Sequence, residues 1–85
     1  MRIEFRQHAR DRLRQRGITE KQVREVLEAP LSATFDPNQV SMRLEGLVRN
    51  RILRVWVRAP WPPASDTVTV KSAAWKGCHD SDIDR

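Results

Sequence analysis

The hydrophobic periodicity of this 85-residue chain changes at Pro30, and this change limits the folds that it can adopt. Before Pro30, apolar residues recur at the three- and four-residue spacing of helices, whereas after it they alternate with polar residues as in strands. The sequence lacks the repeated strand–helix alternation that builds parallel sheets. We therefore expect an α+β fold in which two N-terminal helices pack on one face of a three- to four-stranded antiparallel meander.

The first helix is expected from about Gln7 to Arg16. Phe5, Ala9 and Leu13 recur every four residues and mark its buried stripe. Gly17 supplies the left-handed residue that commonly ends a helix.

A second helix is expected to begin directly after the first. Thr19 and Gln22 have the spacing of a capping box, and Ile18 with Val23 matches the hydrophobic staple that accompanies it. Pro30 ends this helix, because the residue before a proline is pushed out of the helical region. The expected buried stripe consists of Val23, Val26 and Leu27.

The chain after Pro30 has the composition of short strands separated by turns. Glu45-Gly46 is interpreted as a turn or bulge, and the proline-rich segment 59–65 must be a loop. Residues 2–5 also alternate and are expected to form a short edge strand or an extended lead-in. The strand candidates are residues 31–35, 40–44, 51–58 and 67–71.

The chain is long enough for one hydrophobic core but not for two. We expect a single domain over residues 1–75 and a flexible tail over residues 76–85. The single cysteine, Cys78, excludes an internal disulfide and a multi-cysteine zinc site. The tail carboxylates lack the glycine and the distal glutamate of a calcium loop. No apolar run has the length of a membrane span, so we expect a cytoplasmic protein without metal, cofactor or membrane contact.

Arginine dominates the charge of this chain. The net charge is +5, and Lys21, Lys71 and Lys76 are the only lysines among 16 basic residues. The planar arginine side chain binds phosphate oxygens in pairs, which favours a nucleic-acid ligand, RNA above all. A GC-rich genome would also enrich arginine, and this alternative stays open. Residues 1–16 and 40–58 each carry a net charge of +4, whereas residues 17–39 carry −2.

One face of the expected sheet combines basic and aromatic side chains. Period-two alternation separates the core residues Leu53, Val55 and Val57 from the side chains that point to the outer face. An aromatic side chain within a basic surface is typical of proteins that grip a nucleic-acid backbone and stack a base. The alternative is a sheet face that is polar only because it is solvated. The outer face is expected to carry Arg43, Arg54, Trp56, Arg58, Thr69 and Lys71.

A ridge of His8, Arg12 and Arg16 is expected along the first helix, because these residues are spaced by four. Positive side chains at this spacing repel one another unless an anion binds. Histidine exchanges protons near neutral pH, so His8 is a candidate base or acid. An ordinary surface histidine at the start of a helix is the alternative.

The segment HARDRLRQRGI, residues 8–18, resembles a small prokaryotic family of unknown function that is itself similar to the RelE-like toxins of toxin–antitoxin pairs. The similarity extends over residues 3–71, through the second helix to the Val68-Thr69-Val70 strand. It implies a RelE-type fold, a metal-free ribonuclease activity and a neutralising antitoxin. The chain contains no tyrosine, which excludes a tyrosine-assisted mechanism. The residues that match this family are His8, Arg12, Arg16, Arg43, Arg54 and Thr69.

The sequence thus predicts a metal-independent endoribonuclease that is the toxin of a toxin–antitoxin pair. Its partners would be RNA, an acidic antitoxin and the ribosome. The expected catalytic residues are His8, Arg12, Arg43, Arg54 and Lys71, with His8 or Lys71 as base or acid. The expected RNA-binding residues are Arg16, Arg51, Trp56, Arg58 and Thr69. A non-catalytic nucleic-acid-binding module or an antitoxin-docking protein is the alternative.

Overall fold

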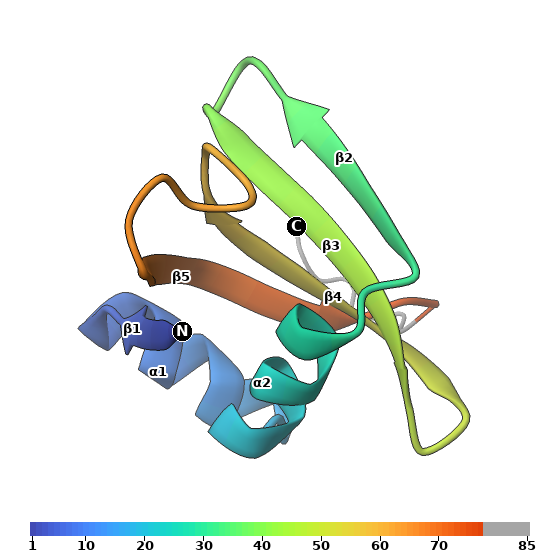
Figure 1. Cartoon of the computed structure of the whole chain (residues 1–85). Helices are drawn as coiled ribbons and strands as arrows, with labels where there is room; N and C mark the ends of the chain where they lie inside the picture. The colour runs from blue at the N-terminus through green and yellow to red at the C-terminus, as the bar shows by residue number, and fades with distance from the viewer. Residues whose placement is uncertain (78–85) are drawn as a thin grey trace.

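The computed structural model describes residues 1–77, which form two helices and five strands (Figure 1). All five strands belong to one sheet, with the order β1-β5-β4-β3-β2. No helix in residues 1–77 is long and apolar enough to cross a membrane. The elements are β1 (Arg2–Phe5), α1 (Gln7–Arg16), α2 (Glu20–Glu28), β2 (Ser32–Asp36), β3 (Ser41–Val48), β4 (Arg51–Arg58) and β5 (Thr67–Trp75).

The expected antiparallel meander of three to four strands is wrong, because the sheet has five strands and is mixed. β2, β3, β4 and β5 pair antiparallel in sequence order. β1, however, pairs parallel with β5, and Ile3 lies opposite Val68. The two paired segments lie at opposite ends of the described chain. No local sequence pattern predicts this pairing. The alternation within a strand shows which side chains share a face, but it does not show which other strand lies beside it.

The helix boundaries that the sequence predicts are confirmed. Gly17 has φ 67° and ends α1, and its N–H donates to the carbonyl of Arg14. The Thr19 hydroxyl accepts a hydrogen bond from the N–H of Gln22 at 3.1 Å. The Gln22 side chain accepts from the N–H of Thr19 at 3.0 Å, which completes the capping box.

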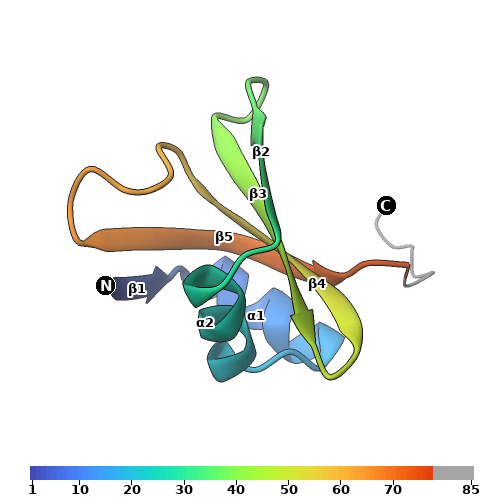
Figure 2. The same ribbon diagram turned by 45° about the vertical axis from the view of Figure 1, so that its right-hand side comes forward.

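Both helices cover the same face of the sheet (Figure 2). α1 packs mainly on β5, whereas α2 packs on β3 and β4. The predicted core residues of β4 are confirmed, since Leu53, Val55 and Val57 are fully buried. They are joined in the core by Ala9, Leu13, Ile18, Val23, Val26, Leu27, Leu44, Val48, Val68, Val70 and Ala73.

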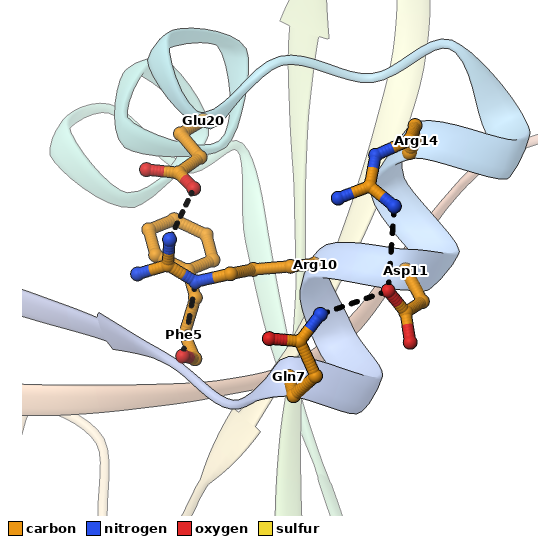
Figure 3. A network of polar contacts seen from close by, with 6 residues as sticks. All are labelled: Phe5, Gln7, Arg10, Asp11, Arg14 and Glu20. Atoms are coloured by element: carbon orange, nitrogen blue, oxygen red, sulfur yellow. Dashed lines mark hydrogen bonds and ion pairs between the residues drawn. The ribbon is translucent and has the colours of Figure 1, made fainter.

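Arg10 ties β1 to both helices (Figure 3). Its Nε donates to the carbonyl of Phe5 at 3.4 Å, and its guanidinium carbon lies 5.9 Å from the centroid of the Phe5 ring. Its Nη1 lies 3.6 Å from a carboxylate oxygen of Glu20 on α2. Arg10 therefore stabilises the fold, and its positive charge is already paired within the protein.

The predicted turn or bulge at Glu45-Gly46 is wrong, because β3 runs through both residues and pairs with β4 in an uninterrupted register. A Cβ atom at Gly46 would lie 3.1 Å from Val26 Cγ1 and 3.2 Å from Val26 Cα. Glycine is therefore needed here for the close approach of α2 to the sheet. The actual turn is Arg49-Asn50, where φ is 52° and 63°, as a two-residue hairpin of type I′ requires.

Replacing Gly46 with valine should lower the free energy of unfolding by about 1–3 kcal/mol, because the new side chain forces α2 away from β3. Urea denaturation followed by circular dichroism measures this change. Leu47→Val, at the exposed neighbouring position, is the control and should change stability by less than about 0.5 kcal/mol.

The Val26→Ala background refines this test, because alanine removes both Cγ atoms that a Cβ at position 46 would meet. Gly46→Ala should therefore cost less stability in that background than in the wild type. Equal losses in the two backgrounds would contradict the role of the Val26 Cγ atoms and leave the backbone contact with Val26 Cα as the cause.

Candidate nucleic-acid interface

The sheet face opposite the helices carries basic and aromatic side chains across β3, β4 and β5. Arg43 on β3 lies opposite Trp56 on β4, and Trp56 lies opposite Ser72 on β5. Arg54 and Arg58 precede and follow Trp56 by two residues on β4, so they share its face. The partly buried Trp56 therefore lies in the middle of this outer face, with arginines on three sides.

Glu45 gathers the cations at one end of the outer face. Its Oε2 accepts a hydrogen bond from Arg54 Nε at 2.7 Å and lies 3.9 Å from Arg43 Nε. Its Oε1 lies 3.8 Å from Lys76 Nζ. The hydrogen bond from Arg54 lowers the pKa of Glu45 below its usual value of 4.5, against the opposing effect of burial, and the three positive charges lower it further. We call these residues the Glu45 cluster.

At the other end of the outer face, a pocket of about 290 Å³ opens to solvent. Two of its residues, Arg6 and His8, come from the start of α1. Arg58 comes from the end of β4, and Lys71 comes from β5. The lining is completed by Gln39 and Val40, from the turn between β2 and β3.

The Lys71 ammonium is held in place at this pocket. It donates hydrogen bonds to Ser41 Oγ at 2.6 Å and to the carbonyl of Gln39 at 3.1 Å. Lys71 lies at an irregularity of the register, because β4 pairs with Val70 and then with Ser72. Such a bulge re-aims a side chain. An ammonium group has three N–H donors, so one remains for a ligand.

The start of α1 adds positive potential to the pocket. Its N-cap residue, Arg6, makes no side-chain capping hydrogen bond, and the first turn contains no acidic residue. The free N–H groups of a helix start attract anions. Within residues 1–77, neither Arg6 nor Arg58 forms an ion pair. Both guanidinium groups can therefore bind an external anion.

A second pocket, of about 500 Å³, adjoins the first and shares Arg6 and Arg58 with it. Thr69 lines this pocket and lies opposite Glu4 of β1, the one acidic residue in the lining. Arg10 contributes as well, although it is already engaged with Glu20. The structure thus places Thr69 beside the first pocket rather than within it.

The ridge of His8, Arg12 and Arg16 lies on α1, which packs against β5. Arg16 has a structural role in this packing. Its Nη1 donates to the carbonyl of Ala73 at 2.7 Å, and Trp75 Nε1 donates to the carbonyl of Arg16 at 3.2 Å. Beyond the end of β1, β5 has no neighbouring strand on this side within residues 1–77, so Arg16 satisfies an otherwise free carbonyl. Arg12 lines neither pocket.

Arg51 lies away from the outer face. It pairs with Val48 at the far end of β4, and its guanidinium carbon lies 4.4 Å from the ring centroid of Trp75. Cation–π stacking of this kind stabilises the end of the sheet. The RNA-binding role that the sequence predicts for Arg51 has no support in this position.

The structure divides the expected catalytic residues between two places. His8 and Lys71 line the pocket, whereas Arg43 and Arg54 belong to the Glu45 cluster. Arg54 precedes Arg58 by four residues on β4, which corresponds to about 13 Å along a strand. The pocket and the Glu45 cluster are therefore separate positions on the outer face.

Sequence reasoning missed Arg6, although its place directly before the first helix was clear. Its contribution depends on the pairing of β1 with β5, which brings the start of α1 to the end of β4. No group of three His, Cys, Asp or Glu side chains in residues 1–77 is placed to hold a metal ion. Cys78 and the tail carboxylates lie outside the described residues, as does most of the expected flexible tail.

The Glu45 cluster should make the stability of the fold sensitive to acid. Because folding lowers the pKa of Glu45, its carboxylate stabilises the folded state above the unfolded value of 4.5, and this contribution is lost as the pH falls through the folded pKa. Glu45→Gln should cost about 1.5–3 kcal/mol at neutral pH, the range for a hydrogen bond to a charged group.

Urea unfolding at a series of pH values measures both effects. The difference in stability between wild type and Glu45→Gln should shrink as the pH falls below 4.5. Glu28→Gln is the control, because it removes an exposed partner of Arg24 and should cost less than about 1 kcal/mol. A constant difference between wild type and Glu45→Gln at all pH values would contradict the assignment.

A family model described as a domain of unknown function, DUF4258, matches residues 5–74. The match begins at the last residue of β1 and reaches into β5, so it includes both helices and every residue that lines the first pocket. Neither a curated protein nor a solved structure matches the chain significantly. The expectation of a family of unknown function is confirmed, whereas the similarity to RelE-like toxins stays a prediction. The chain belongs to the DUF4258 family.

Proposed function

We propose that this protein is a metal-independent endoribonuclease that holds one phosphate of an RNA strand in the pocket of Arg6, His8, Arg58 and Lys71. The pocket carries the proposal, because it collects an imidazole and three cations from distant parts of the chain. The uncapped start of α1 adds to the attraction for a phosphate.

These groups match the needs of RNA cleavage through the ribose 2′-hydroxyl. The 2′-oxygen attacks the adjacent phosphorus, a 2′,3′-cyclic phosphate forms, and the 5′-oxygen of the next nucleotide leaves. His8 takes the proton of the 2′-hydroxyl, and Lys71 gives a proton to the leaving oxygen. The guanidinium groups of Arg6 and Arg58 bind the non-bridging oxygens, on which negative charge grows in the transition state.

The rest of the outer face suits the neighbouring nucleotides. Trp56 lies two residues from Arg58 on the same face and offers a ring on which a base can stack. Arg43, Arg54 and Lys76 outnumber the one carboxylate of the Glu45 cluster, so this end of the face keeps a positive charge for a second phosphate. Arg43 and Arg54 thereby take a binding role rather than a catalytic one.

Purified protein should cleave RNA in the presence of EDTA, and His8→Ala or Arg58→Ala should slow the cleavage about a hundred- to a thousandfold. The products, resolved on a denaturing gel, should end in a 2′,3′-cyclic phosphate. Arg24→Ala is the matched control, because it removes one positive charge from α2, outside both pockets.

Binding to a strand with 2′-deoxyribose at every position separates recognition from cleavage. His8→Ala should bind this strand as tightly as the wild type does, whereas Arg58→Ala should bind it more weakly. Cleavage at the same rate by all variants, or cleavage that needs added metal, would contradict the nuclease proposal.

A non-catalytic nucleic-acid-binding module is the second candidate. The exposure of His8 in a pocket that opens to solvent favours it, because water weakens the electrostatic stabilisation on which catalysis depends. Such a module would bind RNA through the same face and leave its length unchanged.

We also propose that the nuclease is the toxin of a toxin–antitoxin pair that acts on ribosome-associated RNA in the cytoplasm. The support is the resemblance of residues 8–18 to the helix motif described above. Expression in a bacterial host should arrest growth, and Arg58→Ala should abolish the arrest. Co-expression of a small acidic protein encoded beside it should restore growth. Growth arrest by Arg58→Ala at an equal protein level would refute the toxin proposal.

A further inference from the structure

β2 is an edge of the sheet that the helices leave uncovered. The β2–β3 hairpin extends away from α1 and α2 in both views (Figures 1 and 2). Every residue from Ser32 to Phe35 is exposed. Since β2 is last in the strand order and pairs only with β3, its outer backbone groups have no strand partner within residues 1–77.

The side chains of β2 nevertheless alternate as if one side were covered. Phe35 lies opposite Met42 and Ala33 lies opposite Leu44, so both are on the helix-facing side of the sheet. Phe35 is 52% exposed, and Leu31, which directly precedes β2, is 67% exposed. An apolar stripe beside a free strand edge is the usual sign of an interaction surface.

The charge of this segment indicates what kind of partner fits. Residues 29–35 contain no charged side chain, although the protein has a net charge of +5. RNA and acidic proteins are attracted by positive charge, which this edge does not offer. Natural edge strands commonly carry a lysine, a proline or a bulge that prevents self-association, and β2 contains none of these. Asp36, at the end of β2, is the one charged residue of the strand. Residues 29–35 of a second copy can therefore approach this edge without charge repulsion.

We propose that two copies of this protein pair antiparallel through β2 and form one continuous sheet. With the two-fold axis at Thr34, each Phe35 lies beside Ala33 of the second copy. The largest apolar side chain of the strand thus faces the smallest, a complementary cross-strand pair. The same axis places Ser32 beside Asp36 of the second copy. The interface is self-complementary, as two-fold symmetry requires.

The size of the surface sets the expected strength of the dimer. One five-residue strand with a few apolar neighbours buries less than the roughly 1,200 Å² of a standard stable interface. An interface of this size is typical of weak association, so the dimer forms only at high protein concentration. Its axis is perpendicular to the sheet, so the basic outer faces of both copies lie on the same side.

Sedimentation velocity from low micromolar to millimolar concentration tests the proposal. The wild type should change from one chain to two within this range, whereas Phe35→Lys should stay a single chain. Leu47→Lys is the matched control, because Leu47 is 59% exposed but lies on the outer face of β3. It should dimerise like the wild type. Circular dichroism establishes that each variant is folded.

Hydrogen exchange identifies the surface independently of any substitution. Amide protection in residues 32–36 should rise with protein concentration, whereas protection in α2 should not. A wild type that remains a single chain at millimolar concentration overturns the proposal. Equal dissociation by Leu47→Lys and Phe35→Lys overturns it too, as does association without added protection in β2.

Discussion

The parallel pairing of β1 with β5 determines what this protein presents to a ligand. β1 is followed almost at once by α1, so its position on the sheet sets where the helix begins. The same pairing carries Arg6 and His8 to the end of β4, where they meet Arg58 and Lys71. Arg10 secures this arrangement from the helix side through Phe5 and Glu20. This short strand, together with the packing of α1 on β5, therefore fixes the start of α1 relative to the outer face.

Local chemistry was enough to predict the two helices and the faces of β4. The capping box at Thr19 and the left-handed Gly17 act within a few residues, so their effect can be seen in the sequence. The pairing of β1 with β5 and the role of Gly46 could not be predicted in the same way. A glycine fits both a turn and a close approach, and only the position of Val26 on α2 decides between them.

The sequence indicated which kinds of side chain the candidate site contains, but not how these side chains are arranged. Alternation indicated that Arg54 and Arg58 share a face, and the register places them there. It could not indicate which arginines the fold itself uses. Arg16 satisfies a backbone carbonyl of β5, Arg51 stacks on an aromatic ring, and Arg54 binds Glu45. Those partners are remote in sequence. The number of arginines in the sequence is therefore larger than the number that remains available to bind a ligand.

Glu45 has a further effect on how the outer face meets any polyanion. A carboxylate among three cations acts as a built-in counterion, and it neutralises charge that mobile ions would otherwise screen. The salt dependence of nucleic-acid affinity comes from counterions that leave the phosphates when basic side chains of the protein neutralise them. Basic side chains that already pair with Glu45 neutralise fewer phosphates, so fewer counterions are released there. The Glu45 end of the face therefore contributes less to that salt dependence than its number of basic side chains implies.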